Sequence, residues 1–188
     1  MKKSKICFVA LYGPQGVGKT SIATAMTMDS TVPTDKRWKR RALAQPIRDM
    51  LSHIVPDANT TIGKVKESAP KELQGKTIRR ALQTLGTEWG RDMIGQDIWL
   101  DVMVRWAYES NTKRVVVDDL RMQNEYDFFK KRGGLIIQIE RPSIESTSSD
   151  QHKSEVDWKT WTPDFKVKNI NPAEAAREIL DICETHFG

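Results

Sequence analysis

The residues with the clearest chemistry lie in a glycine-rich segment near the start of the chain. Residues 13–20 read G-P-Q-G-V-G-K-T, which fits the pattern G-x-x-x-x-G-K-[ST]. Glycines at this spacing let the backbone curl so that successive N–H groups point at a phosphate, and the N-terminus of the helix that follows adds positive potential. The pattern therefore predicts a site for a nucleoside triphosphate. Its expected members are Gly13, Gln15, Gly16, Val17, Gly18, Lys19, Thr20 and Ser21.

Two side chains at the end of this loop, Lys19 and Thr20, suit the charge of a bound triphosphate. A lysine at this position reaches the β- and γ-phosphate oxygens, and the hydroxyl that follows it can bind Mg²⁺. Asp118 and Asp119 come directly after the apolar run 115–117, and carboxylates at the carboxyl end of a parallel strand lie beside such a loop. Thr20, Asp118 and Asp119 are therefore candidate Mg²⁺ ligands. An exposed turn, in which aspartate is common, is the other interpretation of the two aspartates.

A helical segment in the middle of the chain combines arginine with glycine. Its apolar residues recur at helical spacing between residues 78 and 89, so that Arg79 and Arg91 lie on the remaining faces. Arginine forks match phosphate oxygens, and Gly86 and Gly90 permit the close approach of a ligand or of another backbone. The segment is either the wall of a ligand site or a solvated helix face, and its residues leave both interpretations open.

The elements that position these residues follow from hydrophobic spacing. Continuous apolar runs predict buried strands at 5–12, 114–118, 135–140 and 165–168. Helical patterns lie between them, at 18–28, 46–54, 78–91, 99–106, up to 132, and 172–187. Apolar strands that alternate with helices are typical of a parallel sheet covered on both faces. We therefore predict an α/β fold, a P-loop NTPase three-layer sandwich with a mostly parallel central sheet.

The same pass along the chain predicts its domain organisation. We expect a single domain over residues 1–188, with a helical region at about 46–110 and a mobile lid at about 142–162, where serine, threonine and charge dominate. Residues 55–76 carry prolines, glycines and polar residues without periodicity, and we expect mostly loop there.

Composition limits the classes of protein that remain. The chain has 188 residues, of which 38% are hydrophobic and 29% charged, as expected for an ordinary globular protein. Cys7 and Cys183 lie at opposite ends and are interpreted as buried thiols, which excludes a disulfide scaffold. The apolar run 6–12 is too short to cross a bilayer and has no cleavage site after it, so we expect a cytoplasmic protein without a membrane partner.

The net charge of +5 suits a ligand that carries phosphate. The basic run 36–41 is interleaved only with Trp38, so we interpret it as a solvated edge near an anionic site and expect no nucleic-acid partner. The guanine motif N-K-x-D is absent, which argues against a GTPase, and a motor needs more elements than this length allows. A small-molecule kinase with a closing lid fits best.

Four further segments resemble the deoxynucleoside monophosphate kinases of tailed bacteriophages. Residues 80–91, R-A-L-Q-T-L-G-T-E-W-G-R, are similar to that family and are followed by Trp99. Residues 118–125, D-D-L-R-M-Q-N-E, are close to its D-x-R-x-x-N-E, and residues 152–155, H-K-S-E, match its H-x-S-E. Residues 44–48, A-Q-P-I-R, resemble its A-D-P-[LI]-[KR], with glutamine where the family usually has an acid.

This resemblance implies a P-loop nucleoside-monophosphate kinase that transfers the γ-phosphoryl group of ATP to a deoxynucleoside monophosphate, with ATP and Mg²⁺ as cofactors. It implies that Lys19 stabilises the transferring group and that Arg121 and Arg141 supply charge across the phosphates. On the same resemblance, Thr20 binds Mg²⁺ together with Asp118 or Asp119, and Asp119 is alternatively the residue that orients the acceptor oxygen. The implied acceptor-binding residues are Arg48, Arg79, Gln83, Trp89, Arg91, Trp99, Asp119, Glu125, His152 and Glu155. A phage origin would place the enzyme in the host cytoplasm.

Two other functions are compatible with the loop. One is another small P-loop kinase, such as one that acts on dephospho-coenzyme A. The other is a nucleotide-dependent ATPase that controls contact with DNA or with a protein partner. The substrates expected on the main hypothesis are small molecules. The sequence leaves open whether the protein forms a homodimer.

Overall fold

The computed structural model describes residues 6–28, 33, 36–59, 63–142 and 157–188. The chain divides into two compact units: unit 1 comprises Met1–Ala42 and Trp106–Gly188, and unit 2 comprises Leu43–Arg105. The single-domain organisation stays a prediction, although unit 2 and the expected helical region 46–110 have similar bounds. Most of the expected lid, residues 143–156, lies outside the described residues.

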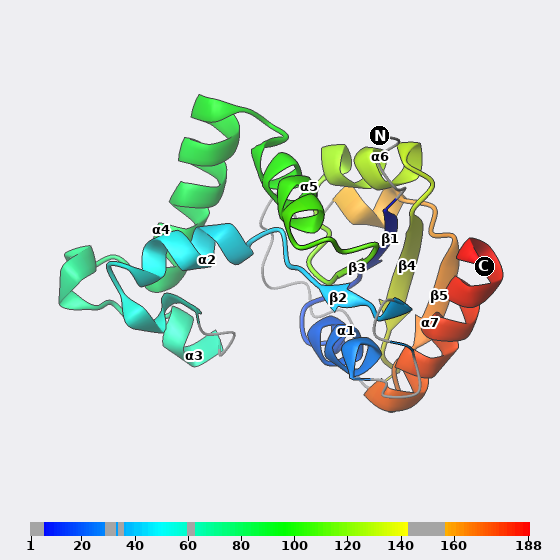
Figure 1. Ribbon diagram of the computed structural model, residues 1–188. Helices are drawn as coiled ribbons and strands as arrows, with labels where there is room; N and C mark the ends of the chain where they lie inside the picture. Colours follow the sequence, from blue (N-terminus) through cyan, green and yellow to red (C-terminus); the bar gives the residue numbers. More distant parts are fainter. Residues whose placement is uncertain (1–5, 29–32, 34–35, 60–62, 143–156) are drawn as a thin grey trace. The chain divides into compact units, whose positions relative to one another are not determined.

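Unit 1 contains a five-stranded sheet in which every strand runs parallel to its neighbours (Figure 1). The strand order is β2-β3-β1-β4-β5, with β1 in the centre. The strands are β1 (Cys7–Tyr12), β2 (Lys39–Arg40), β3 (Arg114–Val117), β4 (Leu135–Glu140) and β5 (Phe165–Lys168). The predicted parallel sheet is confirmed, and β2 is a strand that the apolar pattern did not indicate.

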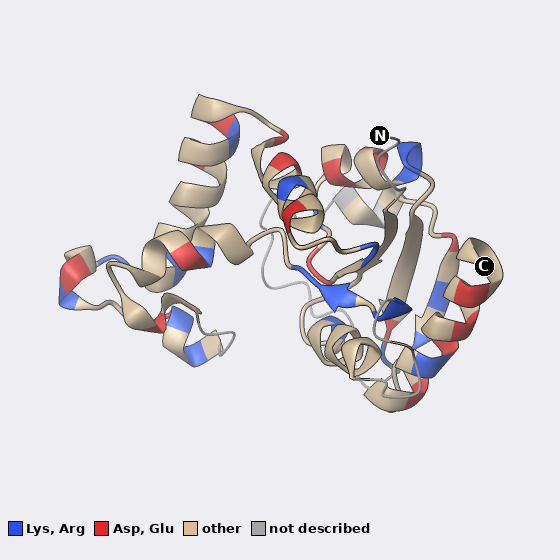
Figure 2. Ribbon diagram, viewed as in Figure 1, with Lys and Arg blue, Asp and Glu red and all other residues tan. Residues whose placement is uncertain are grey.

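One face of the sheet packs against the helices α1 (Lys19–Thr27) and α7 (Pro172–Phe187). Val9 and Leu11 of β1 belong to this layer together with Ile179 of α7, and all three side chains are fully buried. The charged residues of α7 lie on its outer side (Figure 2), as expected for an amphipathic helix.

The opposite face is covered by α6 (Gln123–Lys131) and by the short segment η6 (Asp157–Thr160) with the residue that follows it. Phe8 of β1 packs against Phe129 of α6, with 5.5 Å between ring centroids. Tyr12, at the end of the same strand, contacts Trp161 at 5.4 Å. Because alternate residues of β1 enter two separate apolar layers, the predicted three-layer arrangement is confirmed.

The two cysteines differ in exposure. Cys183 is fully buried in α7, and burial raises the pKa of its thiol to about 12, so the thiol stays protonated at neutral pH. Cys7 is half-buried. The expectation of two buried thiols is therefore right for Cys183 and wrong for Cys7.

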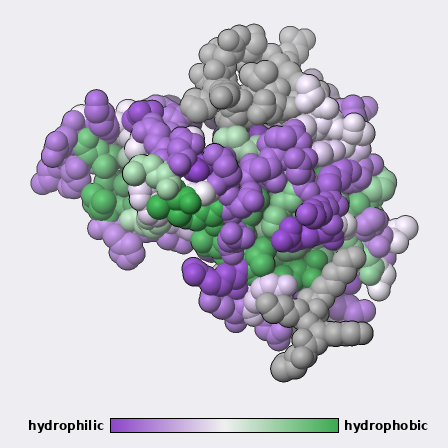
Figure 3. Space-filling view, turned by 90° about the horizontal axis from the view of Figure 1, so that it is seen from above, coloured by the Kyte–Doolittle hydropathy of each residue, from purple (hydrophilic) through white to green (hydrophobic). Residues whose placement is uncertain are grey.

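The surface seen in Figure 3 is mainly hydrophilic, with apolar side chains exposed in separate groups. The most exposed large apolar side chains are those of Met28, Met93 and Ile170, each more than 70% accessible. No helix of the described residues combines the length and the apolarity that a membrane span requires.

Unit 2 is helical. Its elements are α2 (Gln45–Ser52), η2 (Pro56–Asn59), α3 (Gly63–Lys66), η3 (Lys71–Leu73), α4 (Ile78–Gln83), η4 (Thr84–Ile94) and the first part of α5 (Ile98–Glu109). The predicted helix at 46–54 corresponds to α2, which has its proline in the first turn. The expectation of mostly loop at 55–76 is wrong in part, because short helical turns bring Val55 and Ala58 into a small core with Leu51 and Ile78.

The segment η4 is a π-helix rather than the continuous α-helix that the apolar spacing predicts. The indole of Trp99 donates a hydrogen bond of 2.8 Å to the carbonyl oxygen of Gly86, and its ring lies against Gly90. A Cβ atom at Gly90 would lie 2.4 Å from Cζ2 of that ring. Gly90 therefore makes room for the Trp99 side chain, which is only 2% exposed. The π-helix thus coincides with the packing of Trp99, a contact that the apolar spacing of the sequence does not predict.

We expect Gly90→Ala to lower the free energy of unfolding by about 1–3 kcal/mol, because the added methyl overlaps a buried indole. Gly95→Ala is the matched control, since nothing lies within 4 Å of a Cβ at Gly95. Urea unfolding followed by circular dichroism measures both variants. Equal stabilities would show that Trp99 does not occupy the space beside Gly90.

Candidate active site

The glycine-rich loop follows the central strand of the sheet, at the carboxyl ends of the strands. The chain after β1 leads to the β3 side of the sheet, and β4 lies on the other side of β1. Open parallel sheets bind ligands at such a reversal of strand order, because the connections there diverge. Ala10 of β1 pairs with Val117 of β3, which places Asp118 one residue beyond that pair. The loop and the aspartates predicted to act with it therefore lie at the same edge of the sheet.

The glycines of the loop meet specific backbone requirements. Gly13 has a φ of 139°, and a Cβ there would lie 2.4 Å from the carbonyl oxygen of Ile139. Gly18 has a φ of 92° and directly precedes α1. Residues with a side chain rarely adopt these conformations. The loop thus closes against β4 and turns into the helix only with glycine at these two positions.

Lys19 begins α1, and its side chain folds back over the loop. Its ammonium group donates hydrogen bonds to the carbonyl oxygens of Gly13, at 2.6 Å, and of Pro14, at 2.8 Å. Two carbonyl groups of the loop therefore hold the cation, and a phosphate oxygen bound there would compete for the same N–H donors. Thr20 and Ser21, in the first turn of α1, are exposed.

Asp118 has a counter-ion that the sequence analysis did not identify. Arg40, in β2, reaches its Oδ2 atom with Nε at 2.9 Å and with Nη2 at 2.8 Å. The Asp118 side chain is 2% exposed, and its Oδ1 atom is buried with no hydrogen-bond partner among the described residues. The interpretation of the run 36–41 as a solvated edge is therefore wrong for Arg40, which neutralises a buried carboxylate.

The segment after Asp118 is held by Glu125. Its carboxylate is buried and accepts hydrogen bonds from the backbone N–H groups of Arg121, at 2.8 Å, and of Met122, at 3.0 Å. This contact satisfies free N–H groups at the start of α6. The Arg121 side chain is exposed and has no partner among the described residues. Glu125 therefore fixes the backbone that carries Arg121. The predicted contact of Glu125 with the acceptor stays a prediction.

Tyr12 directly precedes the loop and belongs to an aromatic cluster with Trp158, Trp161 and Tyr126. Its hydroxyl group is buried without a hydrogen-bond partner among the described residues. Burial raises the pKa of Tyr12 to about 12, so the hydroxyl stays protonated and is no base at neutral pH.

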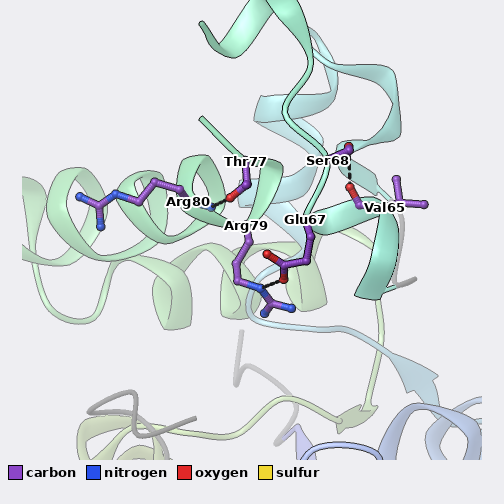
Figure 4. Close-up of polar contacts among 6 residues, drawn as sticks. All are labelled: Val65, Glu67, Ser68, Thr77, Arg79 and Arg80. Atoms are coloured by element: carbon purple, nitrogen blue, oxygen red, sulfur yellow. Dashed lines mark hydrogen bonds and ion pairs between the residues drawn. The ribbon is translucent and has the colours of Figure 1, made fainter. Parts of the chain in front are cut away.

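In unit 2 the predicted arginines have different surroundings. Arg79 forms an ion pair with Glu67, close to the start of α4, where the Thr77 side chain accepts a hydrogen bond from the N–H of Arg80 (Figure 4). Arg91 donates to the carbonyl oxygen of Gln96. These contacts do not bring the predicted arginines together.

Arg48 of α2 differs from the other two arginines. The residue is half-buried, and its guanidinium has no partner within the part of the chain that the structure describes. A cation that is neither paired nor fully solvated is available to a phosphate.

The remaining predicted acceptor residues of unit 2 are buried or half-buried. Trp89 and Trp99 lie 6.2 Å apart, and Gln83 is half-buried on α4. The indole N–H of Trp99 is used by Gly86. Their contact with a base or sugar stays a prediction. His152 and Glu155 lie outside the described residues, and Arg141 is exposed without a partner among those described.

Together, the parallel sheet and the loop after its central strand define a P-loop kinase fold. Shikimate kinase from Aquifex aeolicus VF5 has the same fold: it is 16% identical, with a TM-score of 0.53 over 95% of this chain and 96% of that chain. The family model for deoxynucleotide monophosphate kinase matches residues 57–177. A protein of Acanthamoeba polyphaga mimivirus, provisionally named a deoxynucleotide monophosphate kinase, is 30% identical over 166 residues, which are 81% of this chain and 82% of that protein.

The chain belongs to the deoxynucleotide monophosphate kinase family. The family that the four sequence segments predicted is thereby confirmed, and ATP is the phosphate donor that such a kinase uses.

We expect Arg40→Met to lower the free energy of unfolding by about 3 kcal/mol, because it leaves the Asp118 carboxylate buried without a counter-charge. Lys166→Met, which removes an exposed pair with Glu140 at 3.6 Å in the same unit, should cost less than about 1 kcal/mol. Urea unfolding of both variants makes the comparison.

The double variant Arg40→Met/Asp118→Asn should recover part of the lost stability, since no unpaired charge remains. A double variant less stable than Arg40→Met would contradict the buried-charge explanation.

Proposed function

We propose that the protein transfers the γ-phosphoryl group of ATP to a deoxynucleoside monophosphate, which yields the diphosphate and ADP. The observation that carries the proposal is a phosphate loop with a retained Lys19 in a chain of the deoxynucleotide monophosphate kinase family. The reaction requires little proton chemistry from the protein, so positioning and positive charge supply most of the catalysis.

The donor site belongs to unit 1. Lys19 exchanges the carbonyl oxygens of Gly13 and Pro14 for phosphate oxygens, and it then stabilises the negative charge that develops on the transferring group. The N–H groups of the loop and of the start of α1 surround the same phosphates. In this proposal Arg121 and Arg141, both exposed and unpaired among the described residues, add charge from the opposite side, and Asp119 orients the acceptor oxygen.

A magnesium ion fits the donor set. Bound Mg²⁺ is usually held by one or two carboxylates and by phosphates rather than by a cage of protein ligands, and no group of three His, Cys, Asp or Glu residues that could hold a metal occurs among the described residues. The unpartnered Oδ1 atom of Asp118 and the exposed hydroxyl of Thr20 would hold the ion. When bound, Mg²⁺ neutralises phosphate charge.

Unit 2 supplies the acceptor residues in this proposal. The guanidinium of Arg48, which is without a partner among the described residues, supports its assignment to the 5′-phosphate of the monophosphate, with Arg79 and Arg91 as further contributors. Trp89 and Gln83 contact the base or the sugar, and the buried Trp99 packs against Trp89.

The experiment that tests this function measures ADP release from ATP with a panel of acceptors. The panel contains the four deoxynucleoside monophosphates, the ribonucleotides and dephospho-coenzyme A. Turnover with at least one deoxynucleoside monophosphate supports the proposal. Turnover with dephospho-coenzyme A alone, or ATP hydrolysis that DNA stimulates and monophosphates do not, would refute it.

We expect Lys19→Met to lower kcat by about 100-fold or more, because the transferring group loses its nearest cation. Circular dichroism should show an unchanged fold, and Lys166→Met, which removes an exposed lysine of the same unit, should retain full activity. A variant with the wild-type kcat would place the reaction outside this loop.

Arg48→Ala should raise KM for the monophosphate by about 10- to 100-fold, the loss of one charge-assisted hydrogen bond, and leave KM for ATP near its wild-type value. Arg80→Ala is the control, since Arg80 is exposed on the same unit and pairs with Glu88. Steady-state kinetics with each substrate varied in turn measures both effects. An effect of Arg48→Ala on ATP alone would move this arginine out of the acceptor site.

A further inference from the structure

Asn169, the first residue after β5, connects the end of the sheet to the phosphate loop. It is 2% exposed, and its Nδ2 atom donates a hydrogen bond of 2.6 Å to the carbonyl oxygen of Val17. Its own backbone N–H donates to the carbonyl oxygen of Glu140 at 2.7 Å, which fixes the residue to the end of β4. A residue 152 positions away in the sequence thus contacts the middle of the loop.

The loop is shaped to receive this amide. A Cβ atom at Gly18 would lie 2.2 Å from Nδ2 of Asn169, so no other residue at position 18 leaves room for the contact. The glycine that supplies the φ of 92° before α1 is also the one against which the amide packs.

Stability alone does not explain an asparagine at this position. Its Oδ1 atom is buried and has no hydrogen-bond partner in the part of the chain that the structure describes. Burying an amide with one half unsatisfied disfavours the folded state. The side chain therefore meets a requirement other than filling space, and the one polar contact that its amide makes is with Val17.

That contact determines the direction of the next N–H group. In a trans peptide the carbonyl oxygen and the following N–H point to opposite sides. With the oxygen of Val17 held toward Asn169, the N–H of Gly18 points away from it, and in the proposed function this N–H faces the phosphates. We propose that Asn169 is a positioning residue for the ATP phosphates, which acts by fixing the peptide between Val17 and Gly18. This inference rests on the proposed function.

The test compares Asn169→Ala with Asn171→Ala. Asn171 is an exposed asparagine two residues away, and its side chain caps α7 by accepting from the N–H of Ala173 at 2.9 Å. Its loss destabilises the same segment without touching the loop. The measurements are the Kd of a fluorescent ATP analogue, KM for each substrate, kcat and the melting temperature, with Asn169→Ser as a second variant whose hydroxyl is too short to reach Val17.

We expect Asn169→Ala and Asn169→Ser to raise the Kd of the ATP analogue and KM for ATP by about tenfold, with KM for the monophosphate unchanged. Asn171→Ala should lower the melting temperature and leave ATP affinity intact. Equal ATP affinity in the Asn169 and Asn171 variants overturns the inference, as does a failure of both Asn169 variants to fold while Asn171→Ala folds. Absence of kinase turnover in the wild type would instead overturn the proposed function, since the Asn169 variants do not enter that result.

Discussion

The site depends on the way in which the phosphate loop satisfies its own lysine. Carbonyl groups of Gly13 and Pro14 accept from the ammonium of Lys19, and they can do so because glycines at the two ends of the loop take conformations closed to other residues. The cation is thereby held in place by the partial negative charge of two carbonyl oxygens. In the proposed function a triphosphate offers this ammonium more strongly charged acceptors than the two carbonyl oxygens.

Asp118 likewise has its charge balanced by a neighbouring group of the same unit. A buried carboxylate without a partner is strongly disfavoured, and Arg40 removes this problem through one oxygen while leaving the other unengaged. The pair thus holds the Asp118 side chain at the edge of the sheet in a defined orientation. Its position also explains a two-residue strand: β2 is long enough to carry Arg40 alongside β3.

Local patterns predicted much of this molecule. The strands β1, β3 and β4 are continuous apolar runs, and the loop is a contiguous motif. Both can be predicted because the residues that define them are neighbours in the sequence. What the sequence did not indicate depends on contacts between distant positions. Arg40 meets Asp118 across 78 positions, and Asn169 reaches Val17 from the far end of the chain. Neither pairing leaves a signal in spacing or hydropathy.

The helical unit shows the other limit of pattern reading. The turns between residues 55 and 76 are too short to show periodicity. The apolar spacing of 78–91 fits an α-helix, whereas the backbone is a π-helix from Thr84 onward, where Trp99 packs against it. Among the three predicted acceptor arginines, Arg48 is distinguished by its lack of a side-chain partner among the described residues, a property that depends on folded surroundings and not on residue type.

The π-helix has a consequence for how this segment can change during evolution. Each of its backbone hydrogen bonds spans one residue more than in an α-helix, so a deletion within residues 84–94 would return the backbone toward ordinary winding and rotate everything beyond the deletion. Arg91 and the glycine that adjoins the Trp99 ring would then face new directions together. Substitution can alter single side chains of this segment, whereas a change in its length would reorient a whole row of them at once.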